Sequence, residues 1–332
     1  MFSTIIDAWS LFAVPRPSGG TFASGHYDDG ARVLHYRLFV PDNANGQPMP
    51  LVVMLHGCNQ DATDFARGTG MNALAEEYGC LVLYPEQSCS AHWNRCWNWY
   101  DSAHQRRDEG EPALIAGLTR RIMADHAVDA RRVAVAGLSS GGAMAVILGR
   151  TYPDLFSAVG SHSGLAHGSA TSSAGAMQAM RDGPDPATSA TTAPHAGLPV
   201  IVFHGDADAM VNRENSNDVV RQSVDGHAER RHADIAIVEE TGCAGGRKFT
   251  RRIHREHTGS VLAEQWTVHG SGHAWSGGNL YGSYTDTQGP KASEEMLRFF
   301  MNHPASSAAR RSGSAPPARP APTAARHPPR TA

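Results

Sequence analysis

The stretch that decides the fold is "RRVAVAGLSSGGAMAVIL", residues 131–148. Its first part, 133–136, is an apolar and partly β-branched run that is typical of a short buried strand, and residues 143–150 are rich in good helix formers. The glycines and serines between them must therefore turn the chain sharply. A strand, a tight turn and a helix in this order indicate an α/β protein.

The turn contains "GLSSG" at 137–141, which is the G-x-S-x-G spacing of a nucleophile elbow. The glycines let the strand and the helix approach closely, while the central residue, Ser139, is held in a strained conformation with its side chain exposed. Ser140 would contribute its backbone N–H to an oxyanion hole, and the dipole of the new helix points at the same place. The alternative is a glycine-rich turn with capping serines, but a strand before and a helix after the motif favour catalysis.

Apolar runs and helical patterns alternate along the rest of the chain. The expected strands cover residues 33–40, 51–55, 81–84, 133–136, 158–162, 199–203 and 262–268, and the expected helices cover residues 66–78, 112–126, 143–150, 215–224 and 290–302. This alternation predicts a mostly parallel central sheet with helices on both faces, and such sheets carry their sites at the carboxyl ends of the strands. Residues 166–195 lack periodicity, and we expect them to form a long surface excursion near that edge.

The length of 332 residues suits one large domain with tails. We expect an N-terminal extension over residues 1–29, an α/β domain that carries the site over 30–303, and a disordered tail rich in Pro, Ala and Arg over 304–332. The N-terminus has no positive region before its apolar run and carries Asp7 inside it, so it does not have the pattern of a signal peptide. No stretch approaches the roughly 18 apolar residues that span a bilayer, so we expect no stable membrane insertion.

The charge balance and the cysteines exclude some classes of partner. There are 29 Lys and Arg against 32 Asp and Glu, and because the basic tail holds no acid, the rest of the chain is more acidic than the whole. This disfavours nucleic acid as a partner. The cysteine count is odd and no C-x-x-C pair occurs, which disfavours zinc but leaves one or two disulfides possible. His254 and His257 in "HREH" suggest either a metal pair or a surface turn, and we expect the turn.

A serine nucleophile needs a base and an orienting acid, because a free serine hydroxyl is barely nucleophilic at neutral pH. After an elbow of this kind the acid and then the histidine follow along the chain. The segment "HGDADAMV" at 204–211 offers Asp206 and Asp208, which point the same way in an extended segment, so periodicity does not choose between them. His273 follows in the glycine-rich "HGSGHAWSGG" at 269–278, before the last helix.

A further N–H for the oxyanion hole is expected after the strand in "VVMLHGCNQ", residues 52–60. The loop after this strand supplies the second donor in an architecture with a nucleophile elbow, and the N–H of Cys58 is the candidate. The alternative is a tight turn after a core strand.

Six segments, taken together and in order, resemble the polyhydroxybutyrate depolymerase family of esterases, which are relatives of feruloyl and acetylxylan esterases on the α/β-hydrolase fold. They are "HGCNQ", "YPEQS", "CWNWY", "GLSSGGAMA", "HGDADAMV" and "GSGHAWSGG". The resemblance covers about residues 30–300. It implies Ser139 as the nucleophile, Asp208 rather than Asp206 as the acid, and His273 as the base, with Cys58 in the oxyanion hole.

The resemblance also implies a disulfide between Cys58 and Cys96. Such a bond favours an oxidising compartment and hence an extracellular protein, whereas an N-terminus without a clear export signal leaves the cytoplasm as the alternative. The implied mechanism needs neither a metal nor an organic cofactor.

The substrate is the least defined part of the prediction. Trp97, Trp99, Tyr100 and Trp275 lie in loops beside the expected machinery, where they either line an acyl or polymer cleft or anchor the core. The resemblance implies a serine esterase acting on polyhydroxyalkanoate polyester, on oligomers of 3-hydroxybutyrate or on short-chain esters. The alternatives are a feruloyl or acetylxylan esterase, a peptidase or acyltransferase with the same triad, and a non-catalytic binding protein. The sequence leaves the oligomeric state open.

Overall fold

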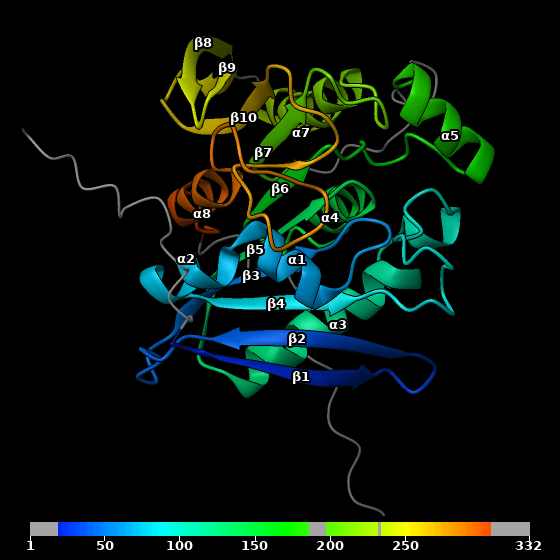
Figure 1. Ribbon diagram of the computed structural model, residues 1–332, viewed down its shortest axis with the longest axis vertical. Coiled ribbons are helices and arrows are strands. Elements are labelled where there is room, and N and C mark those ends of the chain that lie inside the picture. The colour runs from blue at the N-terminus through cyan, green and yellow to red at the C-terminus, as the bar shows by residue number, and fades with distance from the viewer. Residues whose placement is uncertain (1–18, 186–196, 232–233, 307–332) are drawn as a thin grey trace, which may run out of the picture.

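The strand that precedes the GLSSG turn, β5 (Val128–Leu138), lies in the middle of a ten-stranded sheet. The computed structural model describes residues 19–185, 197–231 and 234–306 (Figure 1). The strand order is β1-β2-β4-β3-β5-β6-β7-β10-β9-β8. The other strands of the sheet are β1 (Thr21–Asp28), β2 (Val33–Val40), β3 (Met49–Leu55), β4 (Leu81–Glu86), β6 (Ala158–His162), β7 (Val200–Gly205), β8 (Ile235–Ala244), β9 (Arg247–Glu256) and β10 (Val261–Val268).

The six central strands, from β4 to β10, run parallel, and two antiparallel strands flank them at each edge. The central strands are buried on both faces, which is why they contain nearly continuous apolar runs. A separate two-stranded sheet is formed by β11 (Trp275–Ser276) and β12 (Thr285–Asp286).

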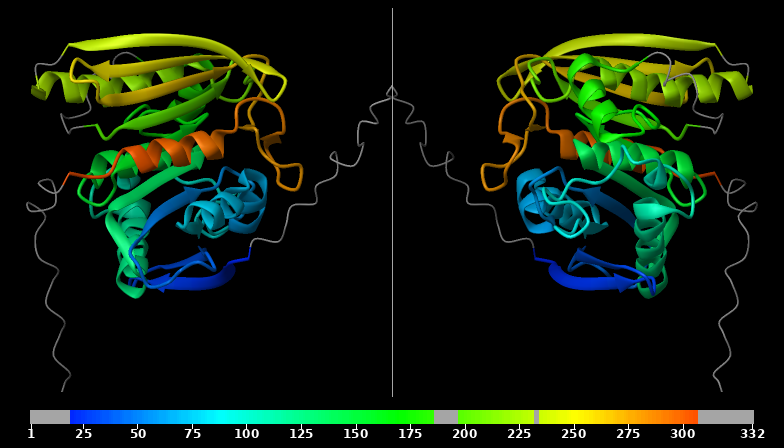
Figure 2. Two further views of the ribbon diagram at one scale, coloured as in Figure 1. Left: turned by 90° about the vertical axis from the view of Figure 1, so that its left-hand side faces the viewer. Right: turned by 90° about the vertical axis from the view of Figure 1, so that its right-hand side faces the viewer.

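Helices cover both faces of the sheet, as the side views in Figure 2 show. Buried side chains of α3, α4, α5 and α7 form one core cluster with the strands, and those of α1, α2 and α8 form a second cluster. The helices are α1 (Ala62–Thr69), α2 (Met71–Tyr78), α3 (Gly110–Asp125), α4 (Ser140–Thr151), α5 (Ser173–Asp182), α7 (Glu214–Arg231) and α8 (Ala292–Asn302), with a short 3-10 helix η2 (Ser102–His104). The predicted fold class is therefore confirmed. In the described part of the chain, none of the helices is long and apolar enough to cross a bilayer.

The predicted helix over 66–78 is wrong in one respect, because the structure divides it into α1 and α2. Gly70 separates them with a φ of 63°, in the left-handed region that glycine adopts without strain. Its N–H donates to the carbonyl of Ala66 and closes the first helix.

The predicted boundaries at both ends of the domain need correction. The presumed extension over 1–29 contains β1, whose residues pair along their whole length with β2. At the other end, Ala305 donates its N–H to the carbonyl of Arg131, so the first residues of the predicted tail are attached to the domain. The rest of that tail, 307–332, and residues 1–18 lie outside the described residues.

Two further segments differ from the prediction. The excursion over 166–195 contains α5, whose Ala176 and Ala179 are buried, while 186–196 lie outside the described residues. The hairpin of β8 and β9 was not predicted, because β8 is an edge strand with mostly exposed residues and gives no alternating apolar pattern. This hairpin places His254 within β9 rather than at a turn, whereas His257 does lie in the turn that follows.

Candidate active site

The GLSSG turn has the geometry of a nucleophile elbow. Ser139 adopts φ 56° and ψ −119°, a strained conformation for a residue with a Cβ. Its N–H donates to the carbonyl of His162 at 2.9 Å, and α4 begins at the next residue. A Cβ on Gly141 would lie 2.1 Å from the carbonyl oxygen of Leu55, so only glycine permits this approach of helix and strand.

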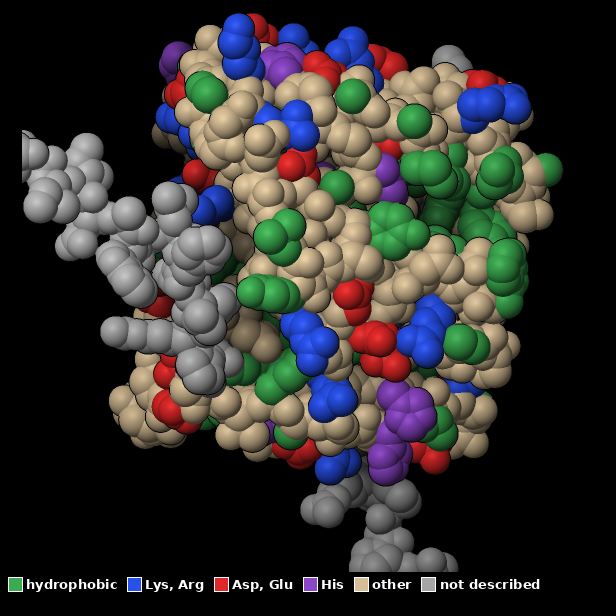
Figure 3. Space-filling model, in the orientation of Figure 1, with side chains coloured by type: hydrophobic (Ala, Val, Ile, Leu, Met, Phe, Trp, Pro, Cys, Tyr) green, Lys and Arg blue, Asp and Glu red, His purple; other side chains and the backbone are tan. Residues whose placement is uncertain are grey.

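The register of the sheet brings the predicted site residues to one edge. Leu138 is paired with His162, His162 with Phe203, and Phe203 with Trp266, so the carboxyl ends of β5, β6, β7 and β10 lie in one row. Ser139 follows the first of these strands, and the loops that carry the candidate acids and His273 follow β7 and β10. Figure 3 shows hydrophobic side chains around a hollow at the right of the face, with a histidine at its rim.

Asp208 is the aspartate that contacts His273, with 2.7 Å between Oδ2 and Nδ1. The side chain of Asp208 is fully buried, and its Oδ1 accepts the N–H groups of Met210 and Val211 at 2.8 and 2.9 Å. The Nε2 of His204 lies 3.3 Å from the same Oδ2. Four donors therefore surround this carboxylate.

These donors keep Asp208 ionised. Burial alone would raise the pKa of Asp208, but the hydrogen bonds from His204 and His273 outweigh it and hold the pKa well below its usual value. An anionic Asp208 places the proton of a neutral His273 on Nδ1 and leaves the lone pair on Nε2. No hydrogen bond joins Ser139 to His273 in the described residues, and contacts of this kind often tighten only when substrate binds.

Asp206, the other aspartate that the sequence left open, does not contact His273. Its Oδ2 lies 2.7 Å from Nδ1 of His269, and its Oδ1 accepts the N–H of Gly270 at 2.6 Å. Burial opposes ionisation, but the hydrogen bonds from His269 and Gly270 lower the pKa of Asp206 overall. Each aspartate therefore has its own histidine.

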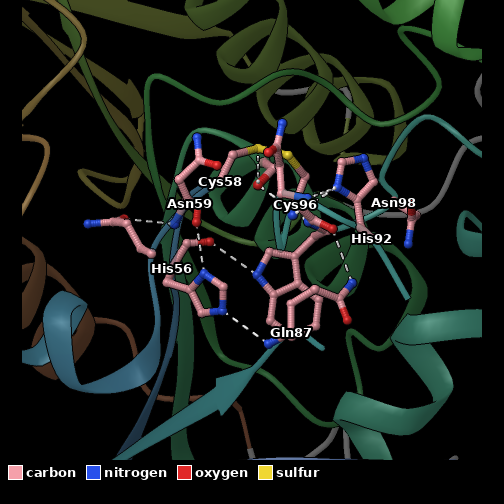
Figure 4. The surroundings of a disulfide bond; sticks show 12 residues. His56, Cys58, Asn59, Gln87, His92, Cys96 and Asn98 are labelled. Carbon is pink, nitrogen blue, oxygen red and sulfur yellow. Dashed lines mark hydrogen bonds between the residues drawn. A yellow bond between two sulfur atoms is a disulfide. The ribbon is translucent and has the colours of Figure 1, made fainter. Parts of the chain in front are cut away.

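The loop after β3 lies directly beside the elbow, since a Cβ on Gly57 would lie 3.4 Å from the carbonyl oxygen of Leu138. Figure 4 shows the disulfide that this loop carries. Cys58 forms the predicted disulfide with Cys96, with an S–S distance of 2.09 Å. Ser140 is buried, and its Oγ lies 3.4 Å from the Sγ of Cys58 and accepts the N–H of Trp97 at 3.4 Å. The second serine of the motif thus joins the elbow to the disulfide and to the "CWNWY" segment.

A buried histidine that the sequence analysis missed orients the Cys58 peptide. His56 Nε2 accepts the N–H of Gln87 at 3.0 Å, so its proton lies on Nδ1, which donates to the carbonyl of Gly57 at 2.8 Å (Figure 4). Burial lowers the pKa of His56 and keeps the ring neutral. In a trans peptide the N–H points opposite to the carbonyl, so the Cys58 N–H points away from this ring.

A second missed histidine, His162, supports the residues that follow His273. It is fully buried between the rings of Phe203 and Trp275, and its Nε2 accepts the N–H of Ser276 at 3.0 Å. Burial, together with the nearby His204 and His273, lowers its pKa to about 3. Nothing in the sequence singles out His162, because it lies at the end of an ordinary apolar strand.

The tryptophans expected to line a substrate cleft are instead buried. Trp97, Trp99 and Trp275 are only 1%, 4% and 1% exposed. The indole N–H of Trp97 donates to the carbonyl of His56, and that of Trp275 donates to Ser293 Oγ. The core-anchoring alternative therefore describes all three, because these rings pack on protein groups rather than on an open cleft.

Other apolar side chains are exposed, and one of them, Met210, lies two residues after Asp208. Trp93, in the loop after β4, is 80% exposed, Met177 on α5 is 67% exposed and Met210 is 58% exposed. No group of three or more metal-ligating side chains occurs within residues 19–185, 197–231 and 234–306.

The parallel sheet, the elbow after its central strand β5 and the acid and histidine loops further along define the class: this is a protein with the α/β-hydrolase fold. The fold is similar to that of an acetyl xylan esterase from Aspergillus awamori, with a TM-score of 0.64 and 18% identity, covering 84% of this chain and 99% of that chain. At this identity the similarity concerns the fold alone.

The chain belongs to the family described as esterase PHB depolymerase, which matches residues 34–242, more than half of the chain. It is 30% identical over 233 residues to poly(3-hydroxyalkanoate) depolymerase C of Paucimonas lemoignei, covering 68% of this chain and 54% of the relative. The chain thus spans about half the length of that relative. It is also 26% identical to acetylxylan esterase A of Emericella nidulans, covering 80% of this chain and 91% of the relative.

Proposed function

We propose that the protein is a serine esterase in which Ser139, His273 and Asp208 form the catalytic triad. The observation that carries the proposal is the 2.7 Å contact between a buried, ionised Asp208 and His273, on the sheet edge where Ser139 occupies its strained turn. A histidine held in this tautomer by a carboxylate is the base that a serine hydroxyl needs.

In the proposed reaction, His273 Nε2 takes the proton of Ser139 as Oγ attacks the ester carbonyl. The N–H groups of Cys58 and Ser140 stabilise the oxyanion, a contribution of about 3 kcal/mol for one such donor. The tetrahedral intermediate collapses, His273 protonates the departing alcohol, and an acyl-enzyme remains. Water then attacks the acyl carbonyl and loses a proton to His273, and His273 returns this proton to Ser139 Oγ as the acid leaves, which restores the starting state.

The proposed substrates are short-chain esters and esters or oligomers of 3-hydroxyalkanoic acids. The name of the Paucimonas lemoignei relative supports this class, as does the exposed apolar side chain of Met210, two residues after Asp208. The second candidate is an acetylxylan esterase, which the near full-length match to the Emericella nidulans protein favours. The Cys58–Cys96 bond supports an extracellular location.

The test is the turnover of p-nitrophenyl esters of increasing acyl length, together with 3-hydroxybutyrate oligomers, methyl ferulate and acetylated xylan. Ser139→Ala should lower kcat at least about 10⁴-fold with an unchanged fold by circular dichroism. Ser140→Ala is the matched control, because it retains the backbone N–H and should reduce kcat far less. Full turnover by Ser139→Ala, or a loss only in Ser140→Ala, would exclude the proposed nucleophile.

A further inference from the structure

Next to the proposed triad lies a second hydrogen-bonded chain of the same three group types. Asp206 Oδ2 lies 2.7 Å from His269 Nδ1, and His269 Nε2 lies 3.0 Å from Thr250 Oγ1. The three residues come from the loop after β7, the loop after β10 and the middle of β9. Hydroxyl, imidazole and carboxylate are thus arranged as in the triad.

The Thr250 hydroxyl does not have the surroundings of a nucleophile. Thr250 is paired with Thr241 on β8 and with Thr267 on β10, so it sits inside a regular strand between two neighbours. It has neither the sharp turn that exposes a nucleophile nor the adjacent helix N-terminus that Ser139 has. The hydroxyl instead satisfies the second nitrogen of His269: with the Nδ1 proton directed at Asp206, Nε2 accepts from Thr250.

The contacts of Asp206, His269 and Thr250 are part of a set of hydrogen bonds that hold residues 269–271, the segment that ends one residue before the proposed base. The backbone of this segment is bound at each residue: the N–H of His269 donates to Lys248, the N–H of Gly270 donates to Asp206, the carbonyl of Gly270 accepts from Arg247, and the carbonyl of Ser271 accepts from Ala207. The Ser271 hydroxyl donates to Asp286 at 3.0 Å.

A single residue, Gly272, separates this segment from His273. Its carbonyl accepts the N–H of Ala274 at 3.0 Å, so the bound backbone of 269–271 continues directly into the turn that carries His273. The imidazole of His273 is therefore placed by its own contact with Asp208, by the bound segment before it, and by the residues after it, where Ser276 donates its N–H to His162. A movement of 269–271 would shift the backbone that carries the base from one side.

We propose that Asp206, His269 and Thr250 are positioning residues. They hold the loop that carries His273, so that its imidazole keeps the correct position relative to the Ser139 hydroxyl. The inference rests on the proposed function, since it concerns the placement of His273 for that reaction. Displacement of a catalytic group by about 1 Å lowers the rate by up to about 100-fold, so partial loosening of the loop should reduce kcat while leaving substrate binding intact.

The test is steady-state kinetics on a p-nitrophenyl ester, with kcat expressed per active site from titration with an organophosphate. His269→Phe and Asp206→Asn should lower kcat roughly tenfold with KM within about twofold, and Thr250→Val should lower it roughly threefold. His269→Asn keeps a donor toward Asp206 and should recover most of the kcat lost in His269→Phe. Glu239→Gln, which removes an exposed ion pair with Arg252 in the same sheet, is the matched control and should change nothing.

Three results would overturn the inference: an unchanged kcat per active site in His269→Phe, even with a lower melting temperature, equal losses in His269→Phe and His269→Asn, or a change in KM alone. Ser139→Ala measured in parallel separates the two proposals. Turnover by that variant contradicts the triad, whereas its inactivity beside a fully active His269→Phe contradicts only the positioning role.

Discussion

The two aspartate–histidine pairs beside the elbow share a contact but differ in their surroundings. Asp208–His273 and Asp206–His269 both place Oδ2 2.7 Å from Nδ1, and both join the loop after β7 to the loop after β10. The side chains of the first pair are 0% and 12% exposed, and those of the second are 27% and 40% exposed. Water can therefore replace the partners of the second pair but not those of the first.

The second ring nitrogen, Nε2, also has different surroundings in the two histidines. His269 Nε2 is bound to Thr250, whereas His273 Nε2 forms no hydrogen bond in the part of the chain that the structure describes, so its lone pair stays available. The comparison shows that an Asp–His contact alone does not define a base. The burial of the acid, the donors around it and an Nε2 that is not bound to a hydroxyl distinguish the two.

The two pairs should differ most in the loss of kcat that follows replacement of the aspartate. Asp208→Asn should lower kcat about 10⁴-fold, because an amide no longer holds the tautomer in which Nε2 is the base. Asp206→Asn should lower kcat only roughly tenfold. The measurement is kcat of both variants on one p-nitrophenyl ester, and losses of equal size would contradict the assignment of separate roles.

A smaller difference is expected in stability. Asp208→Ala should lower the free energy of unfolding by about 3 kcal/mol, because it removes a fully buried carboxylate that accepts hydrogen bonds from His273 and from the N–H groups of Met210 and Val211. Asp206→Ala should lower the free energy of unfolding by only about 1 kcal/mol, since the partners of Asp206 are partly hydrated. Urea unfolding of both variants measures this difference, and similar losses would show that burial does not separate the pairs.

The smallest expected effect is on the pH dependence of the free energy of unfolding, which depends on the burial of a histidine. His162 stays neutral down to a pKa of about 3, whereas its pKa in the unfolded chain is the usual 6.5. The unfolded state therefore binds more protons between these values, and stability falls as the pH falls through this window. Between pH 6 and pH 5 the free energy of unfolding of the unsubstituted protein should fall by about 1 kcal/mol more than that of the His162→Gln variant, as measured by urea unfolding. Parallel pH curves for the two proteins would show that His162 is not the group responsible.

The fold was largely predictable because its central strands and helices have strong periodic patterns. Strands 33–40 and 158–162 have the predicted ends, and the elbow lies where "GLSSG" placed it. The edge strands β1 and β8 were missed, since exposed strands pair through backbone groups and need no apolar face. The division of the helix at Gly70 was also missed, because an isolated glycine is tolerated in helices as well as at their ends.

Spacing alone gave the site as a set of candidates, and only the family resemblance selected Asp208 and the Cys58–Cys96 pair, both of which form the expected contacts. Sequence spacing by itself placed an elbow, two aspartates and one histidine in the expected order, but it could not choose between Asp206 and Asp208, since both follow the same strand at positions that point the same way. Likewise, the aromatic residues of "CWNWY" were compatible with either a cleft or the core, and the burial of Trp97 decided for the core.

The sequence by itself determined the alternation of strands and helices and the tight turn at Ser139, because each depends on residues close together along the chain, and its motifs in order indicated the family and Asp208 as the acid. Only the tertiary structure showed the contact between Asp208 and His273, which histidines are buried and neutral, and how His269 is bound to Thr250. The physical reason is that these properties are set by distances and burial between residues far apart in the sequence, here more than 60 positions for Asp208 and His273.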